Sequence, residues 1–200
     1  MIARLIAGLV RLFTGATAHW KGGAPGPGLR IYFANHTSNL DFVLLWVCLP
    51  PALRARTRPV AAHDYWTGGP LRRWLAGKVF RAVLIERRRV TRENNPLAPM
   101  VGTLREGDSL IIFPEGGRNA SGEIGEFKGG LHHLAREAPE AELVPVFIEN
   151  LNRVLPKGEF LPVPILCAVY FGEPLRPAED ESKADFLARA REAVLALREP

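Results

Sequence analysis

The chain has 200 residues, of which 47% are hydrophobic and 24% charged, and its formal net charge is +5. This composition is typical of one globular domain with a sizeable core, and it excludes a disordered or low-complexity protein. The positive charge favours anionic partners such as phosphorylated small molecules, lipid headgroups or nucleic acid, and charge alone does not choose among them.

Residues 1–13 place large apolar side chains along one helical stripe, with Arg4 and Arg11 outside it, which predicts an amphipathic helix. Because the two arginines interrupt the apolar run, we predict neither a signal peptide nor a membrane-spanning helix. Two interpretations stay open: the helix packs on the domain, or it lies in a membrane interface. We therefore divide the chain into an N-terminal amphipathic segment, residues 1–20, and one domain, residues 21–200.

Apolar stretches and helical patterns alternate along the rest of the chain. Predicted strands cover residues 29–34, 59–62, 82–86, 109–113, 143–148 and 165–171. Predicted helices cover residues 42–49, 70–79, a stretch from 91 or 96 to 107, 130–137 and 183–197. Pro145 indicates an edge strand or a bulge. The alternation predicts a single α/β domain with a mainly parallel, mixed sheet flanked by helices.

The segment 35–41 joins the first strand of the domain to its first helix and carries His36 and Asp41. Asp41 would stand in the first helical turn, where a negative charge is favoured. Its carboxylate could hold one ring nitrogen of His36 and leave the other free to take a proton. The alternative is that Asp41 only helps to start the helix and His36 is an ordinary turn residue.

A glycine-bearing loop follows the strand at 109–113. Gly116 and Gly117 let the backbone approach a ligand and present N–H groups to an anion, and the Arg118 guanidinium suits phosphate oxygens. Arg87 ends another strand, where open α/β sheets collect ligands. The alternative is a plain glycine turn with charged surface residues. A helix that opens near Lys128 is a further candidate anion site.

Metal-ligand patterns are not spelled out in the sequence. His132 and His133 lack acidic or cysteine companions at ligand spacing, which favours packing or surface roles. Cys48 and Cys167 lie far apart in apolar surroundings and indicate buried free thiols. We therefore expect no metal and no cofactor.

The order and separation of these loops resemble the motif blocks of the glycerolipid acyltransferase family, which includes lysophosphatidic acid acyltransferases. The four blocks are matched by Asn35, His36, Ser38 and Asp41; by Ile85, Glu86 and Arg87; by Phe113, Pro114, Glu115, Gly116 and Arg118; and by Val144, Pro145 and Val146. The resemblance covers roughly residues 30–150. It departs from the family pattern at Glu86, where Asp is commoner, and at Gly117 and Asn119, where Thr and Ser are usual.

The resemblance implies transfer of a fatty acyl group from acyl-CoA or acyl carrier protein to the hydroxyl of a lysophospholipid, with 1-acyl-sn-glycerol-3-phosphate as the expected acceptor. His36 would be the general base and Asp41 its orienter. The implied substrate contacts are Arg87, Glu115, Gly116, Gly117 and Arg118, with the arginines on phosphate. Such a protein would act peripherally on the cytoplasmic side of a membrane, without nucleic acid.

Other activities remain open. The acceptor could be a different lysolipid or an amino-acid-derived lipid, because the Gly117 and Asn119 departures fall in the block that contacts the headgroup. Water could replace the alcohol, which would make the protein a hydrolase. A non-catalytic lipid-binding module of the same fold is the alternative from another class.

Overall fold

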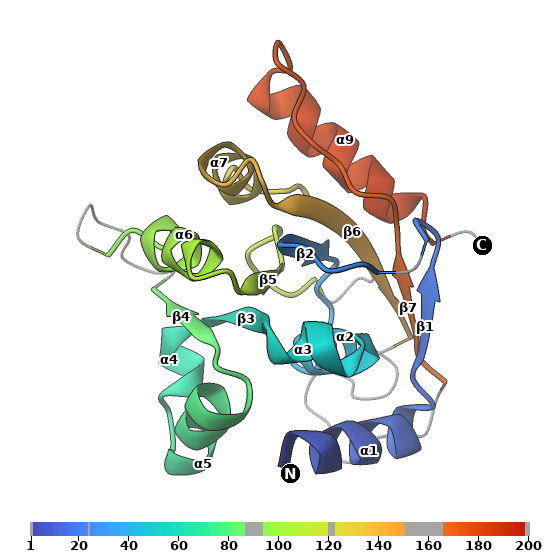
Figure 1. Cartoon of the computed structure of the whole chain (residues 1–200), viewed down its shortest axis with the longest axis vertical. Coiled ribbons are helices and arrows are strands. Elements are labelled where there is room, and N and C mark those ends of the chain that lie inside the picture. The colour runs from blue at the N-terminus through green and yellow to red at the C-terminus, as the bar shows by residue number, and fades with distance from the viewer. Residues whose placement is uncertain (1, 24, 87–93, 120–122, 151–165, 199–200) are drawn as a thin grey trace.

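The computed structural model describes residues 2–23, 25–86, 94–119, 123–150 and 166–198. In this part of the chain, seven strands form one sheet with the order β1-β7-β6-β2-β5-β3-β4 (Figure 1). The strands are β1 (Thr17–Trp20), β2 (Arg30–Ala34), β3 (Thr57–Ala62), β4 (Val83–Ile85), β5 (Ser109–Ile112), β6 (Glu142–Glu149) and β7 (Ala168–Phe171). The described pairs are parallel except β6 with β7, which confirms the predicted α/β fold with a mainly parallel, mixed sheet.

Strand β2 lies at the centre of the sheet, and all five of its residues are buried. Successive side chains of a strand point to opposite faces. Ile31 and Phe33 therefore pack in the apolar cluster on one face, while Tyr32 and Ala34 pack in the cluster on the other. A strand that buries side chains on both faces needs cover on both, and helices provide it here.

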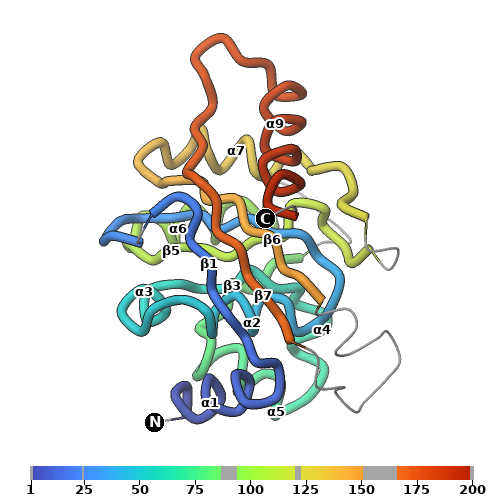
Figure 2. The backbone as a smooth tube through the Cα atoms, turned by 90° about the vertical axis from the view of Figure 1, so that its right-hand side faces the viewer, coloured from blue at the N-terminus to red at the C-terminus, as the bar shows by residue number. Residues whose placement is uncertain are grey.

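Helices cover the two faces as separate layers (Figures 1 and 2). The layer on one face contains α1 (Ile2–Thr14), α2 (Asp41–Cys48) and α3 (Pro51–Ala55), and the layer on the other contains α6 (Leu97–Arg105), α7 (Gly130–Glu137) and α9 (Lys183–Leu195). Between β3 and β4 the chain forms α4 (His63–Trp66), α5 (Pro70–Trp74) and a π-helical segment, Leu75–Val79. All eight residues of α2 are buried, because α2 lies between the sheet and α1.

The predicted N-terminal helix forms, and it packs on the domain through the side that carries its smaller residues. Ala7 and Thr14 are buried, and Ala3 and Val10 pack against the same core cluster. The larger apolar side chains of α1 are exposed, by 43% for Ile2, 62% for Leu5, 45% for Leu9, 77% for Leu12 and 54% for Phe13. The helix therefore contacts the domain and still presents an apolar face outward.

Pro145 does not stand on an edge strand, so that part of the prediction was wrong. Strand β6 lies between β2 and β7. Pro145 pairs with Phe33 of β2 on one side, and on the other its carbonyl accepts the Gly172 N–H at 2.9 Å, just past the end of β7. Proline has no N–H, and at Pro145 this missing donor falls where the β6–β7 ladder ends. Gly172 leaves room for the Pro145 ring, since a Cβ on Gly172 would lie 2.9 Å from Pro145 Cγ.

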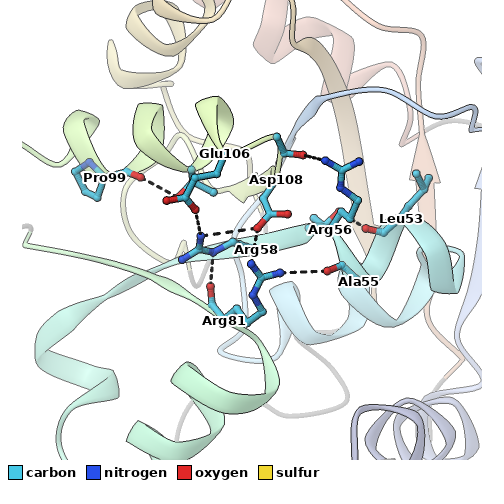
Figure 3. Close-up of polar contacts among 11 residues, drawn as sticks. Leu53, Ala55, Arg56, Arg58, Arg81, Pro99, Glu106 and Asp108 are labelled. Carbon is cyan, nitrogen blue, oxygen red and sulfur yellow. Dashed lines mark hydrogen bonds and ion pairs between the residues drawn. The ribbon is translucent and has the colours of Figure 1, made fainter.

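A polar cluster holds together the amino-terminal ends of β3 and β5, at the opposite end of β5 from the glycine-bearing loop. Figure 3 shows Arg58 between the carboxylates of Glu106 and Asp108, at 3.1 and 3.8 Å. Asp108 also accepts a hydrogen bond from Arg81 at 2.7 Å. Arg81 has a φ of 50°, in the left-handed region that non-glycine residues seldom adopt.

Candidate active site

The two loops singled out in the sequence meet at one edge of the sheet. The loop at 35–40 leaves the carboxyl end of β2, and the loop from Phe113 leaves the carboxyl end of β5. Strands β2 and β5 are parallel neighbours, with Phe33 opposite Ile112, so both loops start side by side. Ligands of open α/β sheets bind outside the carboxyl ends of strands, which makes this edge the candidate active site.

His36 and Asp41 form the predicted pair. His36 Nδ1 lies 2.7 Å from Asp41 Oδ2, and the same oxygen accepts the backbone N–H groups of Thr37 and Ser38 at 2.6 and 2.8 Å. The Asp41 side chain is fully buried, whereas that of His36 is 22% exposed. Because a carboxylate oxygen only accepts, we assign the His36 proton to Nδ1, which leaves Nε2 free to accept a proton.

The His36 ring is held on a second side by an aromatic neighbour. It stacks on Phe113 with a centroid distance of 4.2 Å and an angle of 20° between the rings. Phe113 is the last residue of the strand predicted at 109–113 and belongs to the third motif block, and its contact with His36 was not predicted. The ring of the candidate base is therefore oriented by a carboxylate and by a stacked face together.

Three contacts from distant parts of the chain fix the backbone around His36. Glu115 Oε1 accepts the His36 N–H at 2.9 Å, while Glu115 Oε2 accepts the Gly125 N–H at 2.9 Å. The Asn119 N–H donates to the His36 carbonyl at 2.8 Å. The buried Asn35 side chain donates to the Ile148 carbonyl at 3.0 Å and accepts the Ile148 N–H at 2.8 Å. The loop of β2 is thus tied to the loop of β5 and to β6.

A cavity of about 430 Å³ opens beside the pair, on the face of the sheet covered by α6 and α7. His36 lines it together with Gly116, Gly117 and Lys128. Much of the remaining lining is apolar and includes Val60, Ile85, Leu97, Met100, Ile112, Phe113, Leu131 and Leu134. Such a site is polar at the His36 side and apolar along its walls, which suits an amphiphilic ligand.

The predicted substrate contacts have different positions. Gly116 and Gly117 line the cavity, and Gly116 has a φ of 71° that a residue with a side chain would adopt only under strain. Arg118 is exposed and is not among the lining residues, and both carboxylate oxygens of Glu115 contact backbone N–H groups. Arg87 lies outside the described residues. The roles of all five residues toward substrate stay predictions.

Sequence reasoning did not assign Lys128 or Asn119 to the site. Lys128 was noted at the opening of a helix that was a further candidate anion site, and nothing in the sequence connected its side chain with His36. Asn119 acts through its backbone, so its side-chain type carried no signal at all.

The two buried cysteines are not candidate nucleophiles. Burial raises the pKa of the Cys48 thiol to about 12 and, with the nearby Asp41 charge adding to it, that of Cys167 to about 11. A thiol with such a pKa is protonated near neutral pH and reacts slowly.

Among the described residues, no three His, Cys, Asp or Glu side chains are grouped so that they could hold a metal ion. Nor does any helix in the described ranges have the length and apolar character needed to cross a membrane.

The fold and the histidine pair define an α/β domain with a carboxylate-oriented histidine at the carboxyl end of its central strand. A family model described as acyltransferase matches residues 26–149, more than half of the chain. The chain therefore belongs to the acyltransferase family, which confirms the resemblance drawn from the motif blocks.

Individual relatives carry related names. The chain is 30% identical over 163 residues to 1-acyl-sn-glycerol-3-phosphate acyltransferase alpha of Homo sapiens, covering 79% of this chain and 54% of the relative. It is 28% identical over 175 residues to a 1-acyl-sn-glycerol-3-phosphate acyltransferase of Limnanthes alba, covering 82% and 57%. The chain thus spans about half the length of the curated relatives it matches.

A solved structure shares the fold. The crystal structure of the 1-acyl-sn-glycerophosphate (LPA) acyltransferase PlsC from Thermotoga maritima superposes with a TM-score of 0.76 at 22% sequence identity. The match covers 99% of this chain and 79% of that chain. This likeness shows that the two proteins share the overall fold.

Proposed function

We propose that this protein transfers a fatty acyl group from an acyl thioester to the hydroxyl of 1-acyl-sn-glycerol-3-phosphate. The thioester would be acyl-CoA or the acylated form of acyl carrier protein. The observation that carries the proposal is His36, held by the buried Asp41 at 2.7 Å, at the edge of an apolar cavity of about 430 Å³. The relatives' names, which specify this acceptor, support the choice of substrate.

The mechanism needs one base and no covalent enzyme intermediate. His36 Nε2 takes the proton of the acceptor hydroxyl as its oxygen attacks the thioester carbonyl carbon. The C–S bond then breaks, and the imidazolium returns the proton to the departing thiolate. Asp41 stabilises the imidazolium between these steps and keeps Nδ1 protonated. The backbone N–H of Gly117, which lines the cavity, would stabilise the oxyanion that forms, because the Gly116 N–H already donates to the Phe113 carbonyl at 3.0 Å.

The apolar part of the cavity would bind substrate in the same reaction. Its apolar walls between α6, α7 and the sheet would take an acyl chain, because the lining there is mostly aliphatic. Arg118 and Arg87 would hold the acceptor's phosphate, as the family resemblance implies. Arg118 is not among the residues that line the cavity, and Arg87 lies outside the described residues.

We also propose that the domain acts at a membrane surface, on the side where the acyl thioester is available. Exposed apolar side chains of α1 lie at the same end of the molecule as α5, where Leu71 is 66% and Trp74 41% exposed (Figures 1 and 2). Arg4, Arg11, Arg72 and Arg73 are exposed on these two helices. Apolar side chains flanked by arginines suit an interface with anionic headgroups.

The test is turnover of purified protein with acyl-CoA and 1-acyl-sn-glycerol-3-phosphate, with the products identified by mass spectrometry. We expect a new diacyl phospholipid. His36→Ala should lower kcat by about 10²–10⁴-fold, the usual contribution of general-base catalysis. His19→Ala is the matched control, because His19 lies on the edge strand β1 away from the site. Full activity in His36→Ala would contradict the mechanism, and free fatty acid as the sole product would indicate a hydrolase.

A further inference from the structure

Lys128 lies across the glycine loop of the site. A Cβ placed on Gly116 would be 2.7 Å from Lys128 Nζ and 3.0 Å from its Cδ and Cε, so the lysine side chain runs over the Gly116 backbone. The Lys128 N–H donates to the Pro114 carbonyl at 2.9 Å, which fixes the start of that side chain. Gly116 is thus required by its φ of 71° and also by the lysine that covers it.

Lys128 lines the cavity without a carboxylate partner among the described residues. Of the described residues that line the cavity, it is the only lysine or arginine. It forms no ion pair in the described part of the chain, and the Glu115 carboxylate is already engaged by the N–H groups of His36 and Gly125. An unpaired cation at the polar side of a binding cavity points to an anionic ligand group.

We propose that Lys128 binds a substrate phosphate at the polar side of the cavity that His36 and Gly116 line. Lysine is a common phosphate ligand that acts as a point charge, so it needs no bidentate geometry. The inference rests on the proposed acyl transfer and adds to it a phosphate ligand in the cavity lining, where Arg118 is absent.

Two phosphates of the same chemistry could reach this ammonium. One is the phosphomonoester of the acceptor, and the other belongs to the coenzyme A part of the donor. Both carry negatively charged phosphate oxygens, so the charge of Lys128 alone does not separate them. The experiment therefore removes each phosphate in turn.

The variants are Lys128→Met, which keeps an apolar stem over Gly116 and removes the charge, and Lys128→Arg, which keeps the charge. The matched control is Lys183→Met. Lys183 covers Gly129 in the way that Lys128 covers Gly116, since a Cβ on Gly129 would lie 2.8 Å from Lys183 Nζ, but Lys183 does not line the cavity. The control therefore removes the same net charge close by.

Steady-state kinetics would compare 1-acylglycerol-3-phosphate with 1-monoacylglycerol as acceptor, and acyl-CoA with acyl-pantetheine as donor. We expect Lys128→Met to raise KM for one phosphorylated substrate by about 10- to 100-fold, the size of one lost charge-assisted contact. KM for the analogue of that substrate without phosphate should not change. The substrate whose KM rises carries the phosphate that Lys128 binds, and Lys128→Arg should keep KM for that substrate close to the wild-type value.

A direct binding measurement separates this inference from the proposed reaction. Calorimetric titration with glycerol 3-phosphate and with coenzyme A should show weaker binding of one of them to Lys128→Met than to wild type or Lys183→Met. If wild type binds such a probe through Lys128 and still transfers no acyl group, the proposed function fails and the phosphate site stands. Unchanged KM values and unchanged binding in Lys128→Met, or an equal loss in Lys183→Met, would overturn the inference.

Discussion

Glu115 contacts the backbone of the candidate base, His36, and the family resemblance did not imply this contact. The family resemblance implies that Glu115 positions the glycerol part of the acceptor. In the structure, one of its carboxylate oxygens accepts the His36 N–H and the other accepts the Gly125 N–H. A Cβ on Gly125 would lie 3.1 Å from Glu115 Oε2, so a side chain there would crowd the carboxylate. We infer that Glu115 positions the backbone of His36.

Glu115→Gln tests this role. A glutamine amide offers one acceptor where the carboxylate offers two, so one of the two backbone N–H groups would meet an N–H donor. Losing one such bond costs about 1–3 kcal/mol, and the displacement of His36 should lower kcat by about 10- to 100-fold with acceptor KM little changed. Steady-state kinetics with varied acceptor measure this split. A raised KM with unchanged kcat would instead make Glu115 a substrate ligand.

At the scale of residues, the His36–Asp41 pair could be predicted because it is local: both side chains belong to one turn between a strand and a helix. The Glu115 contact could not, since its partner His36 lies 79 positions earlier in the chain. The stacking of His36 on Phe113 depends in the same way on β2 and β5 being neighbours. Without knowledge that β2 pairs with β5, residue types can be read from the sequence, but distances between their side chains cannot.

At the scale of elements, apolar periodicity predicted most strands and helices, while short or exposed elements escaped it. Strand β1, with residues that are exposed or half-buried, has no apolar alternation to detect, and it is held by its pairing with β7. The predicted helix at 70–79 continues past α5 as a π-helical segment, a change of hydrogen bonding that side-chain pattern does not encode. The final helix could be predicted to its first residue, because Ser182 accepts the Asp185 N–H at 3.2 Å as a capping box requires.

The polar cluster in Figure 3 should stabilise the junction of β3, β5 and the turn before β4. Asp108 is the member that matters most, because its side chain is only 10% exposed and it faces both Arg81 and Arg58. Its contact with Arg81 also offsets the cost of the left-handed conformation of that residue, about 1–2 kcal/mol. We expect Asp108→Asn to lower the free energy of unfolding by about 1–3 kcal/mol in urea titrations.

Glu106→Gln is the control for that prediction. Glu106 also contacts Arg58, at 3.1 Å, but its side chain is 67% exposed. An exposed ion pair contributes little, so this variant should lose less than about 0.5 kcal/mol. Equal losses in Asp108→Asn and Glu106→Gln would show that burial does not set the contribution of this cluster.

At the scale of the whole molecule, the candidate active site and the surface proposed to contact a membrane lie on different helical layers, since the cavity is lined by α6 and α7 and α1 packs on the other face. The α/β class could be predicted from the alternation of elements, and the strand order could not, because nothing local specifies that β6 and β5 flank β2. The orientation of α1 was open between the domain and a membrane. Its small residues pack on the core, so the helix contacts the domain, while Leu5 and Leu12 are exposed and the membrane interpretation stays a prediction.

That arrangement predicts binding to vesicles that contain anionic phospholipid, through the end of the molecule formed by α1 and α5 (Figures 1 and 2). Burying one leucine side chain contributes about 1.5–3 kcal/mol, so Leu5→Asp and Leu12→Asp should each weaken partitioning into vesicles by about tenfold or more in sedimentation assays. Binding should also weaken as salt is raised, because the flanking arginines act through screened charges.

Ala188→Asp adds the same charge on an exposed position of α9, at the far end of the molecule, and should leave partitioning nearly unchanged. Equal weakening by all three variants would mean that net charge, and not the apolar face of α1, determines the binding.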